Sequence, residues 1–158
     1  ARQFLAALPR AVPRAITQLA PLEHETFRLQ PCIRDIWHDH ILFDGNHITG
    51  LIDFGATAVD TPATDIARLL GNFATISPPC RGAASGERHS SDTWPTGLAA
   101  YAAIRPLTDQ EKLATHALDT SGTLLAGCNW IRWIYVDGRQ FDDHPKIVQR
   151  FRQIVDRL

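Results

Sequence analysis

Hydrophobic residues follow two different periods along this 158-residue chain. Between residues 41 and 54, the apolar runs "ILF" and "HITGLIDF" flank Asp44-Gly45-Asn46, a sequence typical of a tight turn. This pattern predicts a β-hairpin whose second strand ends in Asp53-Phe54-Gly55. Outside the hairpin, apolar residues recur at spacings of three and four, as expected for helices that bury one face.

Helical periodicity and end signals predict that most of the remaining chain is helical. Thr108 and Glu111 form the T-x-x-E pattern of a capping box at the start of one helix. Pro9 and Pro13 are expected to interrupt helical structure near the beginning, because proline lacks the N–H that a helix interior uses. The predicted helices cover residues 1–8, 13–22, 61–73, 94–104, 108–118, 121–138 and 144–158.

These elements predict a mainly helical α+β fold in which helices surround one hairpin. The length suits a single domain over residues 1–158, and a hydrophobic fraction of 44% is enough for a core. Residues 77–92 contain Pro, Gly and Ser without periodicity, so we expect a surface loop there.

Composition and charge argue against several classes of function. The chain has 16 Lys and Arg against 17 Asp and Glu, a balance that does not favour nucleic acid as a partner. Its three cysteines are far apart and lack a CxxC spacing, which is typical of reduced thiols in a cytoplasmic protein. No apolar run approaches the roughly 20 residues of a membrane helix, and no signal peptide is visible, so we expect no membrane partner.

Titratable residues are concentrated in residues 31–70, which hold six Asp and three His among aliphatic residues. Asp35 precedes the first hairpin strand and Asp53 ends the second, so the hairpin should bring both to its open end, near His38 and His40. Clustered carboxylates favour a shared proton or a divalent cation, and oxygen ligands suit magnesium. Turn-capping aspartates and a satisfied core histidine are the alternative interpretation of the same residues.

The order of these motifs resembles the C-terminal lobe of the aminoglycoside phosphotransferase and choline kinase family, relatives of the protein kinases. That family has a catalytic loop H-G-D-x-x-x-x-N, an apolar hairpin, then I-D-F or D-F-G and an Asp-containing helix start. The resemblance implies a protein-kinase-like lobe that uses ATP and Mg²⁺ to phosphorylate a hydroxyl of a small molecule. The matching segments are Ile33-Arg34-Asp35, Ile41-Leu42-Phe43, Ile52-Asp53-Phe54-Gly55 and residues 60–67.

The resemblance also implies a role for each matching residue. Asp35 would accept the proton of the attacking hydroxyl, and Asp53 would hold magnesium on the nucleotide phosphates. His40 stands where the family has its metal-binding Asn, so it would share the metal and nucleotide with Asp53. Asp65 would accept backbone N–H groups and hold the catalytic loop, and Arg34 stands where protein kinases have an arginine.

The chain departs from the family pattern in three ways. His40 replaces the Asn and is a softer metal ligand, and Ile33 stands at the position of the family's His. No Gly-rich loop precedes residue 20, so the nucleotide-binding N-terminal lobe is expected in another part of a longer product. Two alternatives to a small-molecule kinase therefore stay open. They are a non-catalytic kinase-like binding module and a metal-dependent phosphohydrolase built on His38, Asp39, His40 and Asp53.

Overall fold

The computed structural model describes residues 1–76 and 90–158. The chain divides into two compact units, one made of Ala1–His24 with Ala117–Leu158 and the other of Glu25–His116. Helices dominate and the strands form two small antiparallel sheets, so the predicted mainly helical α+β class is confirmed. The prediction of a single lobe over residues 1–158 stays a prediction. Among the described residues, no helix is long and apolar enough to cross a membrane.

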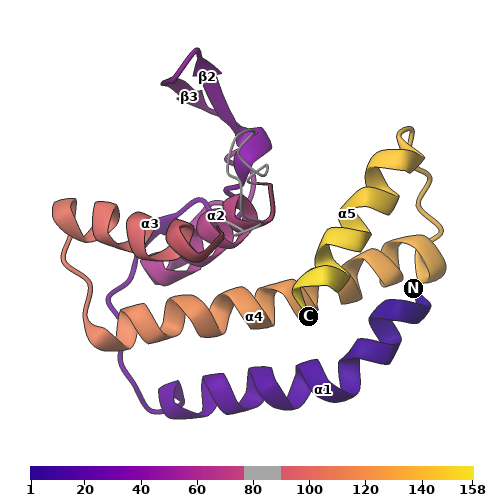
Figure 1. The fold of residues 1–158 in the computed structure, drawn as a ribbon, viewed down its shortest axis with the longest axis horizontal. Coiled ribbons are helices and arrows are strands. Elements are labelled where there is room, and N and C mark those ends of the chain that lie inside the picture. Colours follow the sequence, from indigo (N-terminus) through magenta and orange to yellow (C-terminus); the bar gives the residue numbers. More distant parts are fainter. Residues whose placement is uncertain (77–89) are drawn as a thin grey trace, which may run out of the picture. The chain divides into compact units, whose positions relative to one another are not determined.

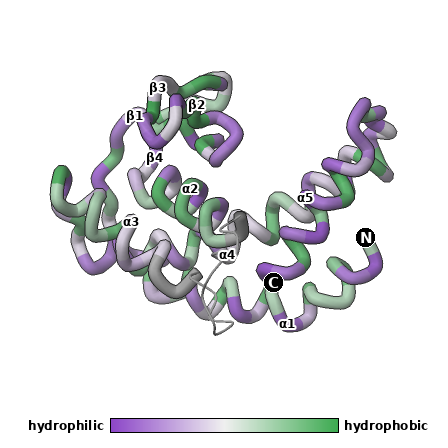
Figure 2. Tube along the Cα trace, turned by 45° about the horizontal axis from the view of Figure 1, so that its top comes forward, coloured by the Kyte–Doolittle hydropathy of each residue, from purple (hydrophilic) through white to green (hydrophobic). Residues whose placement is uncertain are grey.

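The first unit is helical. It contains α1 (Arg2–Leu19), the short η1 (Ala20–Leu22), the second half of α4 (Asp109–Ile131), a π-helical turn η3 (Arg132–Val136), and α5 (His144–Arg157). Apolar residues recur at spacings of three and four among hydrophilic residues of α5, which predicts the amphipathic helix that is found (Figure 2). The core of this unit consists of Ala11, Ala15 and Leu124, with Leu8 and Leu158 packed against them.

Helix α1 runs through both of its prolines, so the predicted interruption is wrong. Pro9 and Pro13 lie four residues apart on the exposed face, where the carbonyls that lose a backbone partner can bind water. The opposite face buries Phe4, Ala11 and Ala15. Burial of this apolar face therefore outweighs the local cost of the prolines.

Helix α4 is also longer than expected, because residues 108–118 and 121–138 were predicted as separate helices. The structure has one helix from Asp109 to Ile131, with Gly122 inside it. Thr115, Ser121 and Thr123 each donate a side-chain hydrogen bond to the carbonyl four residues earlier. These polar residues therefore follow the helix rather than ending it.

The second unit contains the strands and the helices next to them. Strand β1 (Gln30–Cys32) pairs with β4 (Ala58–Asp60), and β2 (Ile41–Asp44) pairs with β3 (His47–Leu51), both antiparallel. Helix α2 (Pro62–Ile76) packs beside α3 (Ser90–Ile104) (Figure 1). Their shared core is Ile66, Leu70 and Leu107, against which Trp94, Leu98 and Tyr101 pack.

The predicted hairpin is confirmed, with Asp44 opposite His47 and a turn between them. Gly45 has a φ of +58°, which glycine adopts without the strain that a Cβ would cause. The hairpin projects away from α2 and α3 (Figure 1), so Phe43 and Ile48 remain exposed. The predicted end of its second strand in Asp53-Phe54-Gly55 is wrong, because β3 ends at Leu51 and Asp53 lies in the connection that follows.

The β1–β4 pair was not predicted. In the sequence, β1 precedes the β2–β3 hairpin and β4 follows it. Cys32 lies opposite Ala58, while Ile41 lies opposite Leu51. The two connections between these pairs, residues 33–40 and 52–57, therefore face each other. They meet through the Ile52 N–H, which donates to the His40 carbonyl at 3.0 Å.

The predicted surface loop over residues 77–92 falls largely outside the described part of the chain, which omits residues 77–89. Its last three residues, 90–92, belong to α3.

The predicted capping box at the start of α4 is present. The Thr108 N–H donates to Glu111 Oε2 at 2.8 Å, and Thr108 Oγ1 accepts from the Glu111 N–H at 3.1 Å. Glu111 is buried and also accepts two hydrogen bonds from the Arg28 guanidinium. These bonds hold the pKa of Glu111 below its ordinary value of 4.5.

We predict that Glu111→Gln lowers the midpoint of urea unfolding at pH 7, because the charge that pairs with Arg28 is lost. The stabilisation by Glu111 is complete above about pH 4.5 and is lost as pH falls through its lower folded-state pKa. The difference between wild type and variant should therefore shrink below that pH. Glu25→Gln, at an exposed position, is the control. Equal midpoints for wild type and Glu111→Gln at pH 7 would contradict this account.

Candidate active site

The loop that carries Asp35 is held by a carboxylate from α2. Asp65 Oδ2 accepts the Ile33 N–H at 2.8 Å, and Asp65 Oδ1 accepts the Arg34 N–H at 2.7 Å. A carboxylate that accepts two backbone donors makes strong, charge-assisted hydrogen bonds. These are the contacts that the family resemblance implies for Asp65, and they fix the backbone one residue before Asp35.

Both connections contain a residue in the left-handed backbone region. Arg34 has a φ of +64° and Asp53 a φ of +62°. This conformation is uncommon for residues with a Cβ and costs about 1–3 kcal/mol where it is strained. The Asp65 hydrogen bond stabilises it at Arg34. The ion pair between Arg34 Nε and Asp60 Oδ2, at 3.3 Å, adds a second contact.

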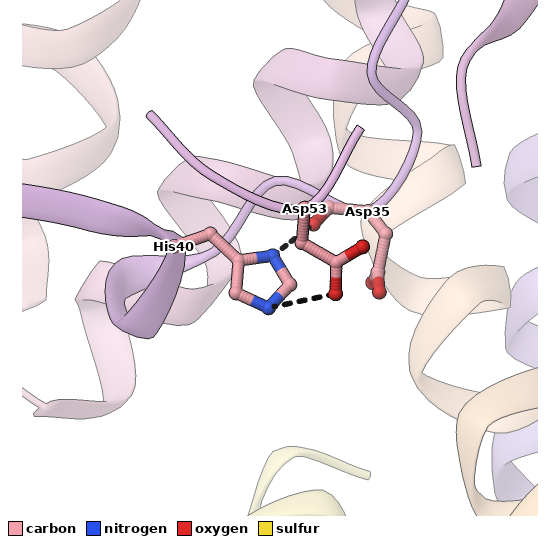
Figure 3. A group of neighbouring side chains, drawn as sticks. All are labelled: Asp35, His40 and Asp53. Atoms are coloured by element: carbon pink, nitrogen blue, oxygen red, sulfur yellow. Dashed lines mark hydrogen bonds and ion pairs between the residues drawn. The ribbon is translucent and has the colours of Figure 1, made fainter. Parts of the chain in front are cut away.

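Asp35, His40 and Asp53 come together between the two connections (Figure 3). Each offers one ligand atom, and these atoms all lie within 4.8 Å of one another. The Asp53 side chain is 59% exposed, whereas that of His40 is only 13% exposed. The cluster therefore joins a fixed imidazole to carboxylates that solvent and small ligands can reach.

Hydrogen bonds define how the His40 ring is used. The Trp37 indole N–H donates to His40 Nε2 at 2.8 Å, so this nitrogen provides a lone pair. The proton then lies on Nδ1, which donates to the Asp35 carbonyl at 2.8 Å. Asp53 Oδ2 lies 3.6 Å from Nε2, and a dashed line marks this contact in Figure 3. His40 thus stabilises its own loop through both ring nitrogens. Its Nε2 can bind a metal only after it loses the hydrogen bond from the Trp37 indole N–H.

The donor set fits a divalent cation. Ligand atoms of one such ion lie at most about 4–5 Å apart, since metal–oxygen distances are about 2.0–2.6 Å. The carboxylates of Asp35 and Asp53 provide the hard oxygens that magnesium prefers, and an imidazole extends the range toward manganese. Asp53 is the most accessible donor of the group.

Arg68 is a contact of the site that sequence reasoning missed. Its Nη2 donates to Asp35 Oδ1 at 2.7 Å, and both side chains are partly exposed. Arg68 lies three residues after Asp65 on α2, so both face the same loop. The three-residue spacing of Asp65 and Arg68 on a predicted helix was the sequence feature that could have indicated this contact.

Of the four residues of the phosphohydrolase alternative, His40 and Asp53 lie in the cluster, whereas His38 and Asp39 lie outside it. His38 contacts Asn72 through Nδ1, and its Nε2 lies 2.9 Å from Asp39 Oδ1. Within the described ranges, neither residue belongs to the group that could hold a metal, which comprises Asp35, His40 and Asp53.

Cys32 lies close to the loop but is not placed for nucleophilic chemistry. The thiol is buried at the end of β1 and donates weakly to the Asp60 and Thr61 carbonyls. Burial, with smaller contributions from the charges of Asp65 and Asp60, raises the pKa of Cys32 to about 11. It therefore stays protonated at neutral pH and acts as a packing residue.

Comparisons with known proteins show which family this chain resembles. Residues 1–107 match the model of the phosphotransferase enzyme family. An 88-residue alignment is 32% identical to homoserine kinase from Polaromonas naphthalenivorans (strain CJ2), and covers 56% of this chain but only 26% of that protein. The chain thus spans about a quarter of the length of this curated relative. No solved structure matches this chain.

We predict that Asp65→Ala lowers the free energy of unfolding by about 1–3 kcal/mol, because two backbone donors lose a charged acceptor. Amide exchange at Ile33 and Arg34 should become faster, whereas Asp65→Asn, which keeps one acceptor oxygen, should have a smaller effect. Asp156→Ala, at an exposed position of α5, is the control. Unchanged exchange at both amides in Asp65→Ala would show that Asp65 does not hold the loop.

Proposed function

The chain belongs to the phosphotransferase enzyme family, and we propose that it forms the catalytic lobe of a small-molecule kinase. The observation that supports this most is the meeting of Asp35 and Asp53 on connections that two strand pairs hold face to face. A lobe of purely structural function has no physical need for two accessible carboxylates so close together.

In this proposal Asp35 receives the proton of a substrate hydroxyl. The hydroxyl oxygen forms a bond to the γ-phosphorus of ATP while the bond from that phosphorus to the β-phosphate oxygen breaks, and ADP leaves. Asp53, with His40 if Trp37 moves, would hold the magnesium that neutralises phosphate charge when it is bound. Asp65 fixes the loop backbone, and Arg34 supports it through Asp60.

The acceptor is a small molecule with a hydroxyl group. Homoserine, which the name of the curated relative contains, has a hydroxyl and is a reasonable first acceptor to screen. The aminoglycoside and choline acceptors implied by the resemblance follow it. We also propose that the N-terminal nucleotide-binding lobe is supplied by the longer gene product, in the cytoplasm.

A non-catalytic binding module is the second candidate, because both ring nitrogens of His40 are engaged by protein groups. An Asn at this position would offer magnesium a hard carbonyl oxygen. If the complete gene product binds nucleotide but transfers no phosphoryl group to any hydroxyl acceptor, this second candidate is favoured.

We predict that Asp35→Asn lowers kcat for phosphoryl transfer by a factor of about 10²–10⁴, because the proton acceptor is lost. Asp53→Asn should mainly raise KM for magnesium–ATP. The assay uses the complete gene product and measures ADP formation that depends on the acceptor. Asp44→Asn, at the hairpin tip and outside the cluster, is the control. Full turnover by Asp35→Asn would remove this residue from the mechanism.

A further inference from the structure

We propose that Arg68 is a positioning residue that keeps Asp35 from binding the metal ion, and thereby keeps it available to the substrate hydroxyl. This inference rests on the proposed function for the role of Asp35. Its structural basis is the 2.7 Å contact between Arg68 Nη2 and Asp35 Oδ1.

Asp35 and Asp53 would compete for the same cation in the absence of Arg68. Their carboxylates and the His40 ring lie within 4.8 Å of one another, close enough to bind one ion together. A carboxylate that coordinates a cation shares its lone-pair electrons with that cation and therefore accepts a proton poorly. The site therefore needs a physical reason for Asp35 to stay uncoordinated while Asp53 binds.

The guanidinium of Arg68 provides that reason. Its positive charge disfavours a second cation on the same carboxylate. Its directional hydrogen bond occupies one oxygen of Asp35 and leaves the other oxygen to accept the proton of a substrate hydroxyl. Arg34, the neighbouring cation of the loop, is instead paired with Asp60. The Arg68 side chain is 37% exposed and that of Asp35 is 40% exposed. The ion pair therefore favours this orientation of the Asp35 carboxylate without fixing it.

A role in stability alone explains Arg68 less well. In the described part of the chain, its Nε atom is buried without a hydrogen-bond acceptor. A buried donor without an acceptor costs free energy, and a smaller or apolar side chain would avoid this cost. Asp65, one turn earlier on α2, already ties the helix to the loop backbone. Arg68 thus adds control of the Asp35 side chain to a loop that is already held.

Binding of Mn²⁺ alone, followed by its electron paramagnetic resonance signal, tests the inference in the complete gene product. Arg68→Gln should bind Mn²⁺ about tenfold more tightly than wild type, because Asp35 becomes an additional ligand. The gain should disappear in Arg68→Gln with Asp35→Asn. Arg68→Lys, which retains the charge, should stay closer to wild type. If Arg68→Gln does not fold, as judged by circular dichroism, Arg68→Met replaces it.

Three results would overturn the inference. They are equal Mn²⁺ affinity for wild type and the folded Arg68 variant, a gain that persists with Asp35→Asn, and no Mn²⁺ binding by any variant. The second result would indicate that loss of the Arg68 charge raises the Mn²⁺ affinity at a distance, without Asp35 as a ligand. In turnover assays, Arg68→Gln should lower kcat without raising KM for ATP, with partial recovery in Arg68→Lys. An inactive wild type would count against the proposed function, whereas the Mn²⁺ measurement would still decide the role of Arg68.

Discussion

The pairing of β1 with β4 is the constraint on which the candidate site depends. These strands enclose the β2–β3 hairpin in the sequence, so residues 33–40 and 52–57 connect the same two strand pairs and must run opposite each other. The side chains of Asp35 and Asp53, on these connections, then lie close together. Asp65 strengthens the arrangement from α2 by accepting two N–H groups of the first connection. If the β1–β4 pair opened, the hairpin would remain but the carboxylates would separate.

Three aspartates of this region have three different environments, and the environment of each suggests its use. Asp65 accepts one backbone N–H on each of its oxygens and holds the loop. Asp35 shares one oxygen with a guanidinium. Asp53 is the most exposed of the three cluster residues, and within residues 1–76 and 90–158 its side chain has one long contact, with His40. A carboxylate that is accessible and weakly paired suits a cation, whereas one that is held but not saturated suits transfer of a proton.

The local features of the site could be predicted from the sequence, whereas its long-range contacts could not. The hairpin follows from the Asp44-Gly45-Asn46 turn and the apolar runs around it, and the meeting of Asp35 with Asp53 follows from the hairpin. The three-residue strands β1 and β4 are too short to show a period, so their pairing was missed. Arg68 was missed because its partner lies 33 residues away. The helix break predicted in α1 is wrong because burial of its apolar face outweighs the local cost of the prolines. The break predicted in α4 is wrong because Ser121 and Thr123 bond carbonyls of the helix itself.

The most direct test of the central claim is a calorimetric titration of ATP into the complete gene product, with and without magnesium. If Asp53 holds the cation that carries the phosphates, binding should require magnesium and should be lost or strongly weakened in Asp53→Asn. Asp44→Asn should bind as wild type does. Binding of equal strength without magnesium, or in Asp53→Asn, would contradict the assignment of Asp53 and with it the account of this site as a phosphotransfer centre.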